Sequence, residues 1–96
     1  MNITKKSVAG TLESSDIMIT LEPNHNGIEI ELKSIVEKQF GQGIRQVIKE
    51  TLTELGISHA KVTAVDKGAL DCAVKARVKT AVYRAVDGVT VFNWKV

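Results

Sequence analysis

The sequence predicts an α+β fold in which an antiparallel sheet of about four strands carries two helices on one face, in the order βββαβα. Three observations support this. Apolar residues alternate with polar ones in four short segments, as in half-buried strands. They recur at spacings of three and four in two longer segments, as in amphipathic helices. The length of 96 residues allows one hydrophobic core and no second one.

Three strands are predicted in the first third of the chain. Alternation covers residues 8–13, 17–22 and 28–33, and it is clearest in the last of these. Residues 14–16 and 23–27 separate the three segments and contain the Ser, Asp, Asn and Gly of tight turns. Strands joined by such short turns form an antiparallel meander.

A long helix is predicted next, because apolar residues follow at helical spacing over residues 36–55. Ser34 and Glu37 fit a capping box, in which each side chain bonds a free backbone N–H at the helix start. Gly56 is suited to end the helix in the left-handed conformation.

The last predicted elements are a fourth strand and a second helix. Alternation returns over residues 60–65, and Asp66 is suited to cap a helix over residues 70–85, which Gly88 ends. Residues 89–94 fit either a short last strand or an apolar tail folded over the core. We expect both helices on the same face of the sheet, since each has a single apolar face.

Composition excludes several classes of protein. A net charge of +2 is too small for a nucleic-acid or polybasic membrane partner, and 4% aromatic residues provide no platform for stacking single strands. No apolar run approaches the roughly 18 residues of a membrane span, and the N-terminus lacks a signal-peptide core. We therefore expect a cytoplasmic protein that forms a single domain over residues 1–96, with residues 1–7 frayed.

Neither a catalytic nor a metal site is indicated. His25 lies in a polar turn and His59 just before a strand, so both are interpreted as surface histidines and not as metal ligands. Cys72 is the only cysteine, and its apolar neighbours favour a small half-buried residue over a reactive thiol. With no nucleophile beside a base, we expect no catalytic residues.

Two further segments are candidates for ligand binding, and each has a simpler structural explanation. Gly41-Gln42-Gly43 lacks the third glycine of a phosphate-binding loop and is better explained by close helix packing. Asp66, Lys67 and Asp71 crowd the start of the second helix, where capping and the helix dipole explain the two carboxylates.

The turn over residues 10–16 places two adjacent hydroxyl groups, those of Ser14 and Ser15, at an exposed tip. Its own neighbours are carboxylates and include no His or Lys, so neither serine is an activated nucleophile. Exposed tips do accept modification by other proteins. From the residues alone, however, an ordinary Ser/Asp turn is the simpler interpretation.

Three motifs favour a modified serine over an ordinary Ser/Asp turn. Residues 8–14 with Asp16, residues 34–41 with Ile44-Arg45, and residues 66–72 resemble, in this order, the acyl carrier protein of citrate lyase, its gamma chain. The resemblance covers the chain from near its start to the second helix. It implies a carrier and not a catalyst. The Asp-Ser-Leu context of fatty-acid-type carriers is absent, so we do not expect their four-helix bundle.

Members of that family carry 2'-(5''-phosphoribosyl)-3'-dephospho-CoA, joined to a serine through a phosphodiester by a prosthetic-group transferase. Ser14 matches the attachment position, and the adjacent Ser15 is the less favoured alternative. The resemblance implies that the arm carries acetyl as a thioester, that the alpha chain exchanges acetyl for citryl, and that the beta chain cleaves citryl to oxaloacetate.

Secondary roles follow from the residues as hypotheses. Lys67 and the first-turn amides of the second helix are candidates to contact the phosphates of the arm, provided that they lie near the turn. Glu13 and Asp16 are candidates for recognition by the transferase. The alternative function is an unmodified α+β scaffold subunit of a larger complex, which needs no serine at the tip.

Overall fold

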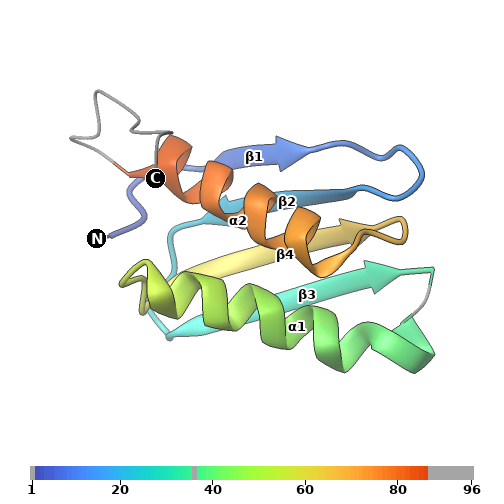
Figure 1. Cartoon of the computed structure of the whole chain (residues 1–96). Coiled ribbons are helices and arrows are strands. Elements are labelled where there is room, and N and C mark those ends of the chain that lie inside the picture. The colour runs from blue at the N-terminus through green and yellow to red at the C-terminus, as the bar shows by residue number, and fades with distance from the viewer. Residues whose placement is uncertain (1, 36, 87–96) are drawn as a thin grey trace.

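The computed structural model describes residues 2–35 and 37–86 and has two layers, a four-stranded sheet and two helices that cover one of its faces (Figure 1). The predicted element order and the placement of both helices on one face are confirmed. The elements are β1 (Ser7–Gly10), β2 (Ile17–Glu22), β3 (Ile28–Ser34), α1 (Glu37–Glu54), β4 (Ala60–Asp66) and α2 (Asp71–Ala85).

The strand order is β1-β2-β4-β3, so the predicted meander is wrong at its third strand. β4 lies between β2 and β3, antiparallel to β2 and parallel to β3, which makes the sheet mostly antiparallel with one parallel pair. The cause is α1, which connects β3 to β4 across the face of the sheet and so returns the chain in the same direction. Glu29, Glu31 and Lys33 are exposed on β3, as suits an edge strand.

The core lies between the sheet and the helices. Alternate residues of β2 and β4 are buried, which confirms the period-two interpretation of these segments. The helical stripe of α1 is confirmed for its central part but not at Phe40, whose side chain is 58% exposed. The largest fully buried apolar side chains are Ile17, Ile19, Leu21, Ile48, Leu52, Val62, Val74, Val78 and Val82.

The sequence predicts how each end of α1 is formed. Gly56 has φ +75°, and the N–H of Ile57 donates to the carbonyl of Leu52 at 2.9 Å, so the predicted left-handed end of the helix is confirmed. Ser34 is the last residue of β3 and α1 begins at Glu37; the predicted capping box depends on the Glu37 side chain, which lies outside the described part of the structure. The Ser34 hydroxyl donates to Oδ2 of Asp66 at 2.8 Å.

Asp66 does not cap α2, contrary to the prediction from the sequence. It is the last residue of β4, and its buried carboxylate accepts hydrogen bonds from the backbone N–H groups of Gly68 and Ala69 at 3.1 and 2.9 Å. Leu70 occupies the N-cap position of α2 without a side-chain cap. Asp66 therefore shapes the connection between β4 and α2. The predicted end at Gly88 and the segment 89–94 lie outside the described residues.

The polar composition of residues 1–7 predicts that they are frayed. In the structure, Ile3, Thr4 and Ser7 pack against the rest of the domain. Ile3 is buried, and the N–H of Thr4 donates to the carbonyl of Ala85 at 2.9 Å. The Ser7 hydroxyl donates to the carbonyl of Ala81 at 2.6 Å. These long-range bonds fasten the first residues to the end of α2. In the described part of the chain, neither helix is long and apolar enough to cross a bilayer.

Candidate functional site

The β1–β2 loop, residues 11–16, carries both candidate serines. Ser14 and Ser15 are exposed, as the sequence predicts for a loop tip. The loop is longer than predicted, because β1 ends at Gly10 and not at residue 13. Gly10 has φ +98°, which takes the backbone out of the strand three residues early.

The β1–β2 loop lies against the β4–α2 loop, residues 67–70. The N–H of Ser15 donates to the carbonyl of Lys67, and the N–H of Lys67 donates to the carbonyl of Asp16, each at 2.8 Å. These two bonds extend the pairing of β2 with β4, in which Ile17 is opposite Asp66. Lys67 and the loop tip are thus neighbours, a proximity that the sequence analysis left open.

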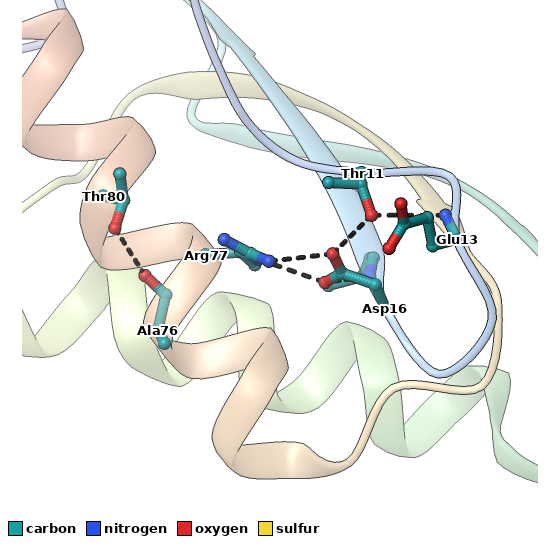
Figure 2. Close-up of polar contacts among 7 residues, drawn as sticks. Thr11, Glu13, Asp16, Ala76, Arg77 and Thr80 are labelled. Carbon is teal, nitrogen blue, oxygen red and sulfur yellow. Dashed lines mark hydrogen bonds and ion pairs between the residues drawn. The ribbon is translucent and has the colours of Figure 1, made fainter.

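Asp16 is the centre of the polar contacts that hold the loop (Figure 2). Its Oδ2 accepts from the Thr11 hydroxyl at 2.6 Å, and its Oδ1 accepts from the N–H of Ile17 at 2.7 Å. Arg77 of α2 binds both carboxylate oxygens, through Nε at 3.1 Å and Nη2 at 2.8 Å. A helix side chain therefore anchors the loop at a residue next to the two serines.

These contacts lower the pKa of Asp16 well below its ordinary value of 3.8. The hydrogen bonds from Arg77 are the largest cause, followed by the bond from Thr11, and both favour the ionised carboxylate. Partial burial opposes them. In turn, the carboxylate raises the pKa of Arg77. Both members of the pair are thus ionised at neutral pH.

The substitution Asp16→Asn is expected to lower the free energy of unfolding at pH 7 by about 1 kcal/mol, because it removes the charge that Arg77 binds. A carboxylate whose pKa is lower in the folded state stabilises the fold above its ordinary pKa, and this stabilisation is lost as the pH falls below 3.8. The difference between the wild type and Asp16→Asn should therefore shrink below about pH 4. Urea denaturation at a series of pH values measures it, and a difference that stays constant to pH 2 would contradict the assignment.

Arg77 was not among the residues predicted to belong to the site. Its sequence context offers no signal, since it is one of several basic residues on an ordinary helical pattern. Its partner Asp16 is 61 positions away along the chain, and only the packing of α2 over β1 and β2 brings them together.

The remaining candidates do not form a second site with Ser14. His25 and His59 are exposed, as predicted, and they line one surface hollow of about 370 Å³ at the opposite end of the sheet. Within residues 2–35 and 37–86, no three His, Cys, Asp or Glu side chains are grouped to hold a metal ion. Cys72 is exposed, so the prediction of a half-buried residue is wrong.

The glycines at residues 41–43 lie within α1 and not in a phosphate-binding loop. Close packing does not explain Gly43, because it is exposed and a Cβ atom there would meet nothing within 4 Å. Gly41, in contrast, is buried.

Comparisons with known proteins show which family the chain belongs to. The family model "ACP: Malonate decarboxylase delta subunit (MdcD)" matches residues 4–85. The citrate lyase acyl carrier protein of Streptococcus mutans is 59% identical over 96 residues, covering 99% of this chain and 93% of that protein. That of Halothermothrix orenii is 53% identical over 88 residues, covering 92% and 94%. The chain belongs to the family of citrate lyase acyl carrier proteins.

Membership in this family makes the chain an acyl carrier and not an enzyme. A chain in the crystal structure of a Pseudomonas malonate decarboxylase hetero-tetramer in complex with malonate has the same fold, with a TM-score of 0.76. The match covers 90% of this chain and 89% of that one at 16% identity, so it supports the fold alone. The sheet with two covering helices also confirms that the carrier does not have a four-helix bundle.

Proposed function

We propose that this chain is the acyl carrier subunit of a citrate lyase and that Ser14 bears 2'-(5''-phosphoribosyl)-3'-dephospho-CoA through a phosphodiester. The observation that carries the proposal is an exposed Ser14 on a loop that Asp16 and Arg77 hold in place, in a chain of this family. The thiol of the bound group would carry the acetyl and citryl groups as thioesters between the alpha chain and the beta chain.

The surroundings of Ser14 fit a passive acceptor. The two histidines lie at the other end of the sheet, where β2 ends and β4 begins, and Arg77 is ionised and bound to Asp16. Among the described residues, no hydrogen bond joins the Ser14 hydroxyl to a base. Attachment therefore requires a transferase that supplies the base. Asp16 is engaged by Arg77, which leaves the exposed Glu13 as the carboxylate available for recognition by that enzyme.

The rigid loop serves the carrier function physically. A covalent tether keeps the thioester near both partner sites at an effective concentration on the order of millimolar, with no dissociation between the two reactions. The bonds of Asp16 to α2 and of Ser15 and Asp16 to the β4–α2 loop hold the root of the tether against the domain.

The test is intact-mass spectrometry of the chain purified from a host that expresses the whole lyase operon. We expect an increase in mass equal to the phosphoribosyl-dephospho-CoA group, located on the tryptic peptide that contains Ser14. A bare mass from that host would contradict the proposal and favour the unmodified scaffold. Material from a foreign host serves as the control, because it lacks the modifying enzymes.

Lys67 is proposed to contact the phosphates of the arm, since its backbone is bonded to Ser15 and Asp16 at the root of the tether. In the modified protein, Lys67→Ala should increase the mobility of the arm without preventing attachment. ³¹P NMR line widths measure that mobility. Lys61→Ala is the matched control, because Lys61 is exposed at the other end of β4. Equal line widths in Lys67→Ala and in the wild type would exclude the contact.

A further inference from the structure

An apolar groove lies between the start of α1 and the β4–α2 loop. Its volume is about 710 Å³, and two of its lining side chains are unusually exposed for their type, Phe40 at 58% and Leu70 at 73%. Its lining includes Phe40, Ile44, Gly68, Leu70 and Asp71.

The two segments that line the groove, the start of α1 and the β4–α2 loop, lie at the same end of the molecule as the β1–β2 loop (Figure 1). Four of the five exposed large apolar residues that the structure describes belong to segments at this end: Leu12 to the β1–β2 loop, Ile35 to the segment directly after β3, Phe40 to the start of α1 and Leu70 to the β4–α2 loop. Ile35 approaches Gly68, since its Cδ1 would lie 3.8 Å from a Cβ atom at that glycine. A concentration of exposed apolar surface in one place marks a binding surface.

The root of the tether is next to the groove. Ser15 and Asp16 are bonded to Lys67, and the next residue, Gly68, lines the groove. Any group attached at Ser14 therefore starts at the edge of this hollow. Lys67 adds a cation at the junction, which complements the phosphates of such a group.

We propose that the groove binds the adenine base of the arm, an inference that rests on the proposed attachment at Ser14. The phosphodiester and two ribose rings separate this base from the serine, so it is the first flat apolar part of the arm to reach the hollow. The exposed Phe40 ring offers it a stacking surface, and the Asp71 carboxylate in the lining offers an acceptor for its amino group.

Binding of the base leaves the distal pantetheine thiol free. The carrier needs this freedom, because two partner chains must reach the thiol in turn. The tether also makes weak binding sufficient, since a millimolar effective concentration half-fills a site whose dissociation constant is millimolar. The base can therefore dock and leave rapidly while the root of the arm stays ordered.

The test uses isotope-labelled modified protein from the operon host. We expect NOEs from adenine H2 and H8 to the methyl groups of Ile44 and Leu70, and adenine shifts displaced from those of free dephospho-CoA. Phe40→Ala should reduce the docked-to-free ratio, read from these shifts, by about fivefold or more, as expected for loss of one stacking contact. Leu12→Ala is the matched control, because Leu12 is 55% exposed at the same end but does not line the groove.

The outcomes separate the two proposals. A bare mass refutes attachment and with it the docking. A modified protein whose adenine shifts equal those of free dephospho-CoA keeps the carrier function and overturns the docking. NOEs to the groove from the pantetheine methyl groups in place of the adenine protons also overturn it, as does an equal effect of Leu12→Ala and Phe40→Ala.

Discussion

Ser14→Ala is expected to abolish attachment of the prosthetic group completely, because no other atom at that position can form the phosphodiester. In a host with the whole operon, the purified variant should have the bare mass, and the reconstituted lyase should lose all citrate cleavage. The fold should be unaffected, since Ser14 is exposed. Far-UV circular dichroism and the thermal midpoint provide the control for folding.

Ser15 is the necessary comparison, since its hydroxyl is adjacent and also exposed. Its φ of +64° lies in the left-handed region, which glycine adopts without strain. Ser15→Gly therefore removes the hydroxyl and preserves the loop, and this variant should be modified as fully as the wild type. An adduct retained in Ser14→Ala but lost in Ser15→Gly would transfer the attachment to Ser15.

Gly10→Ala is expected to destabilise the domain by about 2–5 kcal/mol. A Cβ atom at this residue would lie 1.8 Å from the carbonyl oxygen of Ile17, and the φ of +98° is unfavourable for any L side chain. Both β1 and β2 must shift to relieve the overlap. For a domain of this size the thermal midpoint should fall by about 10 °C or more, as measured by calorimetry.

Gly27→Ala and Gly43→Ala distinguish the steric overlap from the unfavourable φ as the cause of the lost stability. Gly27 has φ +80° but open space around a Cβ atom, so Gly27→Ala should cost only the conformational part, about 1–2 kcal/mol. Gly43 is helical with open space, so Gly43→Ala should stabilise the domain by about 0.5–1 kcal/mol. Wild-type stability in Gly10→Ala would contradict the close approach of β1 to Ile17.

Gly10 also links the fold to the site. It directly precedes the loop that carries Ser14, and its conformation directs Thr11 toward Asp16. We therefore expect Gly10→Ala to be modified more slowly by the transferase than Gly27→Ala, which lies at the other end of the sheet.

Local pattern was sufficient for the elements themselves. Alternation at residues 17–22 and 60–65 and the helical stripe through Ile48 and Leu52 correspond to observed elements, because each side chain's burial there depends on its own position in a strand or helix. Gly56 was predictable for the same reason, since its left-handed conformation is a local property. The motif containing Ser14 was also readable, and it led to the family before any contact was known.

What the local pattern could not supply is the set of contacts between distant segments. The insertion of β4 between β2 and β3, the bond from Ser34 to Asp66 and the anchoring of Asp16 by Arg77 each join residues at least 32 positions apart. Phe40 illustrates the same limit, since helical spacing predicts burial whereas none of the described elements covers its side chain. The amino-acid sequence alone determined which segments fold and that Ser14 and Ser15 lie on an exposed loop. Only the tertiary structure decided which side chains hold the loop and that an open apolar groove lies beside it, because long-range pairing depends on where the whole chain packs.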